Sequence, residues 1–296
     1  MLDVIKNRKI YLGFSLMLVV LSLSAVMIFG LRPGIDLKGG TEWQVTVEKS
    51  DATEVSIQAA LQTVSNGMEL SVKQSGDGSF IIHLPNLSEG EHEKYAGALK
   101  QAFGGVSEKN FSSIGPAVGS ELKNKAIWAI VLVMLGISLF VAWAFRKVSE
   151  PVKSWKYGAV TLLSLLHDVS IPAGMLALLG YWKGIEIDTN FIVALLVVMG
   201  FSVHDTIVVF DRIRENLTVN RGKKIDLGEI IKFSVKETFV RSVNTSLTLI
   251  VVLSVLLVFG PASLFYFILT ILVGTIFGTY SSIFVASPLL YLWQKK

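Results

Sequence analysis

Residues 190–210 read NFIVALLVVMGFSVHDTIVVF, a run of 21 residues in which the only charged side chain is Asp205. A helix needs about 20 predominantly apolar residues to cross the hydrocarbon core of a bilayer. The run therefore predicts a membrane-spanning helix that carries one acidic group into the membrane.

Five further apolar runs lie on either side of this one, and the only charged residue inside them is Asp168. The chain of 296 residues has a mean hydropathy of +0.59 and 17% charged residues, whereas soluble domains carry about 25%. This composition argues against an ordinary soluble enzyme. The first run is too long for a cleaved signal peptide, so we expect it to persist as the first span. We expect six transmembrane helices, at residues 10–31, 126–145, 157–181, 190–210, 243–260 and 264–285.

Lys and Arg are distributed unevenly between the two sides of the predicted membrane. One side holds 17 Lys and Arg against seven Asp and Glu, and the other side holds 10 against 14. Because cationic loops stay in the cytoplasm, we expect both termini, residues 1–9 and 286–296, to be cytoplasmic. The formal net charge of +4 therefore reflects a cationic inner face and gives no indication of nucleic-acid binding.

Residues 32–125 form a long segment on the other side with the composition of a folded domain. Apolar residues alternate along its first strand. A capping box at Asp51-x-x-Glu54 and a turn signal at Gly76-Asp77-Gly78 separate further elements. The expected order is strand 41–48, helix to about 66, strands 68–74 and 79–84, helix 88–103 and strand 111–114. This βαββαβ order is typical of a ferredoxin-like α+β extracytoplasmic domain with one open sheet face.

The cytoplasmic link 211–242 is predicted to contain an amphipathic helix over Asp226–Val240, which Asp226 and Glu229 would cap. Such a helix either docks onto a partner and couples motion to it, or lies on the lipid headgroups. The sequence favours neither interpretation.

Two predicted spans carry an acidic residue directly after a histidine, as Leu166-His167-Asp168-Val169 and Val203-His204-Asp205-Thr206. Ionisable side chains inside a membrane are costly, so they usually face a bundle interior or a water-filled cavity and mark ion pathways. The function predicted for Asp205 and Asp168 is therefore ion coupling, and the alternative is a hydrogen bond between helices. The histidines titrate near neutral pH. For His167 we favour a neutral, structurally bonded ring, and for His204 both roles stay open.

Two other residues bear on these acids. Pro172 removes the hydrogen bond to the carbonyl group of Asp168, which predicts a kinked or hydrated helix there or a kink packed by neighbouring helices. Arg241 begins the fifth span and is followed by a polar series, Ser242, Asn244, Thr245, Ser246 and Thr248. It is either a membrane anchor or a counter-ion that pairs with Asp205 in one state and releases it in another.

Several classes of catalytic site are missing from the sequence. It contains no phosphate-binding loop, no Gly-x-Ser-x-Gly, no His-Glu-x-x-His and no cysteine. His83 and His92 show no ligand-like spacing. We therefore expect no enzyme activity, no cofactor and no metal, and any energy used must come from an ion gradient or a partner.

Four motifs in order resemble the SecD/SecF family of protein-export membrane proteins. They are Gly34–Thr41 (GIDLKGGT), Ile114–Glu121 (IGPAVGSE), His167–Val169 (HDV) and Asp205–Asn216 (DTIVVFDRIREN), and Arg241–Ser246 (RSVNTS) also fits. The resemblance covers nearly the whole chain. It is closer to the SecF branch, because SecD carries a much larger outer region than the 94 residues present here.

This resemblance implies a subunit of the Sec translocase in the bacterial plasma (inner) membrane. It would pair with SecD in a twelve-span assembly of the resistance–nodulation–division type and work with SecYEG, with YajC and YidC as associated components. It would use the proton-motive force to pull the unfolded exported polypeptide after the motor SecA has acted. The resemblance assigns ion coupling to Asp205 and Arg241. His204 departs from the family, which usually has Asn before that Asp.

Two other functions are compatible with the sequence. One is an ion-driven efflux subunit of the same superfamily, although an outer domain of 94 residues is small for a ligand pocket. The other is a scaffold for SecD that takes no part in ion coupling, in which Asp168, Asp205 and Arg241 could all be neutralised without effect.

Overall fold

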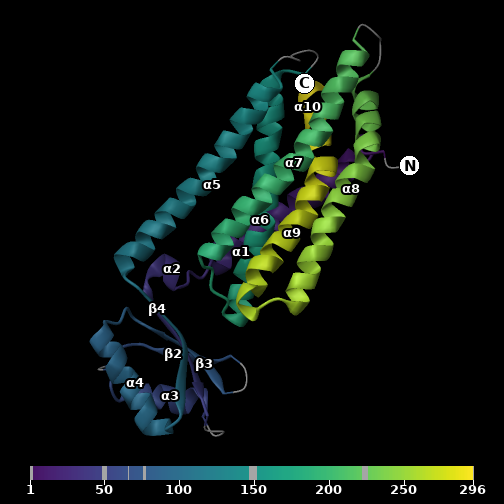
Figure 1. The fold of residues 1–296 in the computed structure, drawn as a ribbon. Coiled ribbons are helices and arrows are strands. Elements are labelled where there is room, and N and C mark those ends of the chain that lie inside the picture. The colour runs from purple at the N-terminus through teal and green to yellow at the C-terminus, as the bar shows by residue number, and fades with distance from the viewer. Residues whose placement is uncertain are drawn as a thin grey trace. The chain divides into compact units, whose positions relative to one another are not determined.

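The computed structural model describes residues 3–48, 52–65, 67–75, 78–146, 152–221 and 226–295. The chain separates into two compact units (Figure 1). A helical unit comprises Met1–Arg32 and Ile127–Lys296, and an α+β unit comprises Pro33–Ala126. Asp51 and the Gly76-Asp77 turn, which the sequence predicts as a cap and a hairpin, lie outside the described residues.

The described part of the chain has six helical segments long and apolar enough to cross a membrane. The sixth segment is α9 and α10 joined by a π-helical turn, η2. The bounds are α1 Arg8–Phe29, α5 Pro116–Ala144, α6 Ser154–Lys183, α7 Thr189–Val219, α8 Leu227–Phe259, η1 Ala262–Leu264, α9 Phe265–Ser281, η2 Ser282–Ala286 and α10 Ser287–Lys295.

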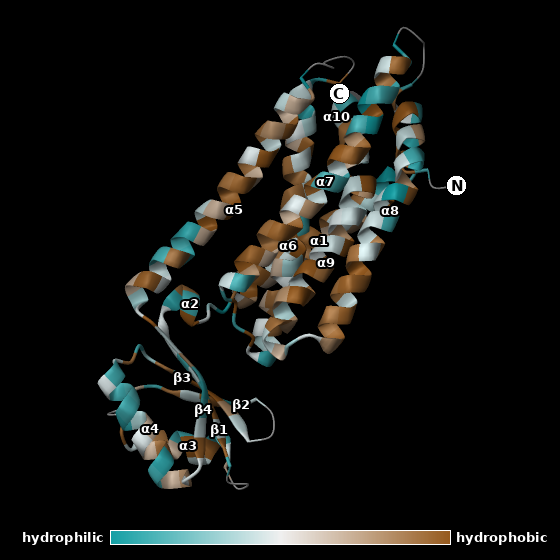
Figure 2. Cartoon of the chain, viewed as in Figure 1, coloured by the Kyte–Doolittle hydropathy of each residue, from teal (hydrophilic) through white to brown (hydrophobic). Residues whose placement is uncertain are grey.

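Helices α6 and α7 form the interior of the helical unit. Of their most apolar windows, 56% and 50% are buried, against 11% for α1 and for α5. Large apolar side chains such as Met27, Trp128 and Phe259 are exposed, and Figure 2 shows hydrophobic residues along the lengths of these helices. Apolar surface of this extent is typical of contact with lipid or with another membrane protein.

Small residues allow the interior helices to approach closely, as they do in many membrane bundles. A Cβ atom built on Gly274 of α9 would overlap the Val198 side chain of α7, and one built on Gly278 would lie 3.0 Å from the Cβ of Ser202. Helix α9 therefore lies directly against α7 at the level of Ser202.

The segment predicted as a link with a separate amphipathic helix differs in the structure. Helix α7 continues to Val219, and one unbroken helix, α8, runs from Leu227 to Phe259. Asp226 caps α8 by accepting a hydrogen bond from the backbone N–H of Gly228 (2.9 Å). The sequence has no Pro or Gly between 229 and 259 to end the helix. Figure 2 shows α8 changing from a hydrophilic to a hydrophobic half. Likewise, α10 extends the last span to Lys295.

The α+β unit contains a four-stranded antiparallel sheet with strand order β2-β3-β1-β4. Its buried core joins Trp43, Phe80 and Ile82 of the strands to Ile57 and Leu99 of the helices, so both helices cover the same sheet face. The elements are α2 Ile35–Lys38, β1 Gly40–Val47, α3 Glu54–Gln62, β2 Ser71–Gln74, β3 Ser79–Leu84, α4 Glu89–Phe103 and β4 Val106–Ile114.

Two element boundaries in this unit differ from the sequence prediction. Thr53 caps α3, with Ser56 as its reciprocal partner, and Glu54 instead accepts a hydrogen bond from the backbone N–H of Gln74 (2.7 Å). Strand β4 begins at Val106 rather than 111, because β1 pairs with it along its full length across a bulge.

The motif segments 34–41 and 114–121 pack against each other. Gly39 has a φ angle of +83°, and a Cβ atom there would lie 2.6 Å from the Cα of Pro116. A Cβ atom on Gly119 would lie 2.5 Å from the backbone nitrogen of Gly39. Glycine is required at both positions because two backbones meet without room for a side chain.

Candidate functional site

Asp205 is buried in the helical unit, with 2% of its surface exposed. The hydroxyl of Ser246 on α8 donates to its Oδ2 (3.2 Å). The hydroxyl of Thr279 on α9 donates to Ser246 Oγ (2.6 Å). A chain of hydroxyl groups therefore links the carboxyl group of α7 to two neighbouring helices.

Asp168 on α6 is fully buried and receives three hydrogen bonds. His167 Nδ1 lies 2.7 Å from its Oδ1, Ser281 Oγ of α9 donates to its Oδ2 (2.8 Å), and Ser202 Oγ of α7 donates to the same oxygen. The α6 helix continues through Pro172. Three donors on one carboxyl group provide the compensation that a buried charge requires.

The two acids belong to one polar layer across α6, α7, α8 and α9. Ser202, which bonds Asp168, lies three residues before Asp205 on α7, so both point toward the same side of that helix. Thr279 and Ser281 lie two residues apart on α9. Thr279 bonds Ser246, which bonds Asp205, whereas Ser281 bonds Asp168 directly. The structure thus brings Asp168 and Asp205 together through shared helices.

The structure does not bring the other two predicted residues into this interior. His204 and Arg241 are both exposed on the surface of the helical unit. Within the residues described, no ion pair joins Arg241 to Asp205. The predicted pairing of these two residues is therefore absent from this conformation, in which Ser246 satisfies the carboxyl group.

Arg241 lines a polar hollow of about 540 Å³ between α7 and α8, together with Asp211, Glu215 and Glu237. Arg212, which also lines the hollow, lies seven residues or about two turns after Asp205 on α7. The hollow provides space for water beside Arg241.

An ion-pair cluster beside this hollow is a feature that the sequence did not predict. Arg212 Nε and Nη2 donate to the two carboxyl oxygens of Glu237 (2.6 and 2.7 Å), and its Nη1 donates to Glu215 (2.6 Å). Asn216 donates to Glu237 (3.0 Å) and to Ser234 Oγ (2.9 Å). Bidentate pairs of this kind fix geometry strongly. The second half of the motif DTIVVFDRIREN thus holds α8 against α7, one turn before Arg241.

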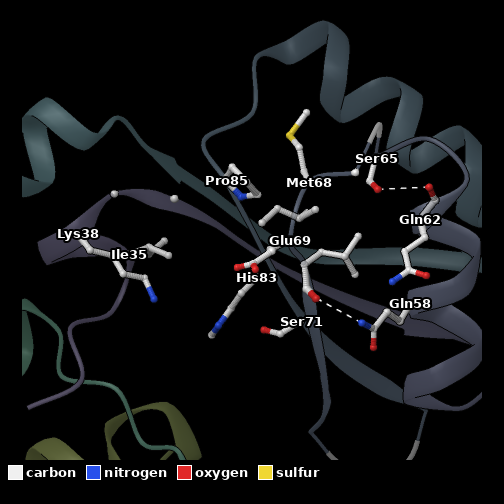
Figure 3. A pocket seen from close by; sticks show the side chains of 15 residues that line it. Ile35, Lys38, Gln58, Gln62, Ser65, Met68, Glu69, Ser71, His83 and Pro85 are labelled. Carbon is white, nitrogen blue, oxygen red and sulfur yellow. Dashed lines mark hydrogen bonds between the residues drawn. The ribbon is translucent and has the colours of Figure 1, made fainter.

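The α+β unit has an open hollow of about 800 Å³ whose walls are formed by α2, the end of α3 and the segment leading into β2. Figure 3 shows Gln58, Gln62, Glu69 and His83 around it. The Gln58 amide donates to the carbonyl oxygen of Leu70 (3.5 Å). The lining mixes polar and apolar groups and presents no arrangement typical of catalysis.

The histidines of the α+β unit have structural partners. His92 Nε2 lies 2.8 Å from Glu108, and His83 Nε2 lies 3.3 Å from Glu42. In the described part of the chain, no three His, Asp or Glu side chains gather closely enough to hold a metal ion.

Comparison with known proteins places these features in a family. Residues 94–296 match the family described as protein export membrane protein SecD/SecF, C-terminal, and residues 25–51 match the SecD/SecF GG motif. The chain is 42% identical to the protein translocase subunit SecF of Thermobaculum terrenum, over all of this chain and 95% of that one. It is 35% identical to SecF of Sebaldella termitidis, over 99% and 92%.

A solved structure has the same fold. The crystal structure of SecDF, a translocon-associated membrane protein from Thermus thermophilus, superposes with a TM-score of 0.84 at 31% identity and covers the whole of this chain. The chain spans 39% of the length of that SecDF protein. Together, the six apolar helices, the small antiparallel sheet and these relatives show a multi-pass bacterial inner-membrane protein that is a translocase subunit rather than a conventional enzyme. The chain belongs to the SecD/SecF family of protein-export membrane proteins.

Proposed function

We propose that the chain is the SecF component of a SecD–SecF complex, which uses the proton-motive force to drive late, ATP-independent steps of protein export through SecYEG. The observation that carries this proposal is the pair of buried carboxyl groups in the helical interior. An ionisable group at that depth costs several kcal/mol, and the hydroxyl groups around it provide a route for proton exchange.

In the proposed cycle, Asp205 takes up and releases the coupling proton. When Asp205 is protonated it needs no counter-ion, and Ser246 can direct its hydroxyl hydrogen to the carbonyl oxygen of Ser242, 2.8 Å away. When Asp205 is ionised, Arg241 moves from the hollow toward it and forms an ion pair. Exchange between the two states would shift α8 relative to α7.

Asp168 and His204 have different places in this proposal. Asp168 is the second carboxyl group of the polar layer, linked to α7 through Ser202. His204 directly precedes Asp205 but is exposed on α7, so we assign it to the surface that meets a partner helix or lipid. Its charge there would influence proton transfer at Asp205 without direct contact.

The orientation and partners follow from charge and from the relatives. The excess of Lys and Arg in residues 1–9, 211–242 and 286–296 supports a cytoplasmic location for both termini. The solved SecDF protein carries a SecF-like region in one chain with further sequence, which supports SecD as the partner. SecYEG, SecA, YajC, YidC and the unfolded exported polypeptide complete the proposed assembly.

We assign the α+β unit to the extracytoplasmic side as a ferredoxin-like domain. The βαββαβ element order and the sheet order β2-β3-β1-β4 support this assignment. Helices α3 and α4 cover one face of the sheet, and the other face carries Glu42, Gln44 and Thr46 of β1. That polar face is available to a partner domain.

Replacement of Asp205 with Asn tests the proposal. The variant should associate with SecD normally and lose the gradient-dependent part of export, measured as translocation into inverted membrane vesicles with and without a proton gradient. Glu229→Gln is the control, because it removes an exposed carboxyl group of α8 that lies outside the hollow and is paired with Lys232 (3.6 Å). If Asp205→Asn exported as efficiently as Glu229→Gln, the chain would be a scaffold.

A further inference from the structure

Helices α1 and α6 run parallel and keep one register along their contact. The rings of Phe29 and Tyr181 lie 4.5 Å apart at one end. A Cβ atom built on Gly174 would lie 2.5 Å from the Cα atom of Ser22 farther along. In both pairs the residues are 152 positions apart in the sequence. A constant separation over two turns means that the facing residues can be assigned along the whole contact.

The same separation places Ser15 opposite His167, two turns from the contact of Ser22. Each of these side chains is 4% exposed. Ser15 Oγ and His167 Nε2 are buried atoms for which the described part of the chain supplies no hydrogen-bond partner. Two unsatisfied polar atoms at one level of a membrane bundle require an explanation, because native interiors contain few of them.

Tyr280 of α9 brings a third polar group to the same place. Its hydroxyl donates to the carbonyl oxygen of Tyr11 (3.2 Å), which lies one turn before Ser15 on α1. Its ring stacks on the ring of His167, with centroids 6.4 Å apart and an angle of 24° between the planes. Groups from α1, α6 and α9 therefore lie beside the His167 ring at one level of the helical unit.

The other side of the His167 ring is already engaged. Nδ1 lies 2.7 Å from Asp168 Oδ1, so proton exchange with the surroundings must occur at Nε2. The hydroxyl of Ser281 lies near both Asp168 Oδ2 (2.8 Å) and the carbonyl oxygen of Gly278 (3.0 Å). It can rotate between these acceptors as the charge of the His167–Asp168 pair changes.

We propose that Ser15, His167 and Tyr280 bind a buried water molecule, and that His167 and Asp168 form a proton-binding site served by this water and distinct from Asp205. A buried water typically makes about three hydrogen bonds to otherwise unsatisfied groups, and three groups meet here. Uptake adds one proton at Nε2 while Nδ1 keeps its bond to Asp168, and release returns that proton to the water.

The groups that face the site are few. Among the described residues, α9 brings the titratable side chain of Tyr280 to it, and α1 brings the backbone carbonyl of Tyr11, whose ring packs on Phe284. Helix α7 contributes Ser202, with Asp205 one turn farther along. On α6 itself the sequence has no Lys or Arg between Lys156 and Lys183. The proton is therefore held mainly by the His167–Asp168 pair. The role of this site in export rests on the proposed function, but the binding of the proton does not.

The test uses the full chain with its SecD partner in lipid nanodiscs, with ring-labelled histidine followed by nitrogen NMR across about pH 5 to 8. His167→Gln identifies the His167 signals among the four histidines. We expect a pH-dependent change of the Nε2 signal that Asp168→Asn shifts and Asp205→Asn retains. Ser15→Ala and Tyr280→Phe should each shift the Nε2 signal, because each removes one group that holds the water.

Ser22→Ala is the matched control, since it removes a hydroxyl from the same helix face without changing the site. An Nε2 signal that stays constant over the whole pH range would overturn the proposal. Equal spectra for Ser15→Ala and Ser22→Ala would do the same. Loss of export in Asp205→Asn bears only on the proposed function, because the NMR titration is read without any export.

Discussion

A methyl group added at Gly174 should separate α1 from α6. The new Cβ atom would lie 2.5 Å from the Cα and Cβ atoms of Ser22 and 2.9 Å from its carbonyl oxygen, whereas carbon atoms in contact normally stay about 3.5–4.0 Å apart. Overpacking costs about 1–3 kcal/mol, and the upper end applies here because the obstacle is backbone. Alanine regains about 1 kcal/mol of helix propensity over glycine. The net loss of stability in Gly174→Ala should therefore be about 2 kcal/mol, or roughly 30-fold in the unfolding equilibrium.

Gly200 of α7 provides the matched comparison, because a Cβ atom there would meet nothing within 4 Å. Gly200→Ala should gain about 1 kcal/mol from helix propensity alone, which leaves about 3 kcal/mol between the two variants. Reversible unfolding of the full chain in mixed micelles, titrated with sodium dodecyl sulfate and followed by circular dichroism, measures both. If Gly174→Ala unfolded at the same detergent fraction as Gly200→Ala, the close approach of α1 and α6 would be wrong. The inference that Ser15 lies opposite His167 would then fail as well.

Two other perturbations have defined outcomes. Ser88 caps α4, and its hydrogen bonds lower the pKa of Glu91 in the folded chain below the ordinary value of 4.5. Because the folded-state pKa is lower than the unfolded-state pKa, the ionised Glu91 stabilises α4 fully above pH 4.5. This stabilisation is lost as the pH falls through the folded-state pKa. The protection factors of the α4 amide hydrogens, that is, their exchange rates relative to an unfolded peptide at the same pH, should therefore fall at acid pH. Ser88→Ala should cost about 1 kcal/mol and flatten this dependence. Equal protection factors in Ser88→Ala and the parent chain at every pH would show that the cap does not stabilise α4. Because Arg212 and Glu237 form a bidentate pair, Glu237→Arg should be defective in gradient-driven export. The double variant Arg212→Glu, Glu237→Arg should restore part of that export. Equal defects in the single and double variants would show that the pair does not position α8.

The long apolar helices of the helical unit could be predicted from the sequence, because a helix must carry about 20 apolar residues to cross the bilayer. The junction between α8 and the preceding segment was harder. Charged residues up to Arg241 indicated a boundary at the membrane surface, but a change from polar to apolar composition does not end a helix. Proline and a capping glycine are the strongest signals that a helix ends, and neither residue occurs between 229 and 259.

The hydroxyl groups around the two acids were not predictable from the sequence. Serine in a membrane helix can satisfy its own hydroxyl by bonding the carbonyl four residues earlier, as Ser246 does with Ser242. Its presence therefore says little about contacts with other helices. The bond between His167 and Asp168 was also unexpected, because consecutive residues point about 100° apart on a helix. The structure shows that their side chains still meet.

Helix α9 connects the two acids physically. Thr279 continues the hydrogen-bond chain that reaches Asp205, Tyr280 bonds α1 beside His167, and Ser281 bonds Asp168. These three consecutive residues end directly at the π-helical turn η2, and such turns often occur at functional sites. A rotation of α9 about its axis would alter all three contacts at once. The effects of neutralising the two acids should therefore be non-additive, as expected for residues that share one hydrogen-bonded network.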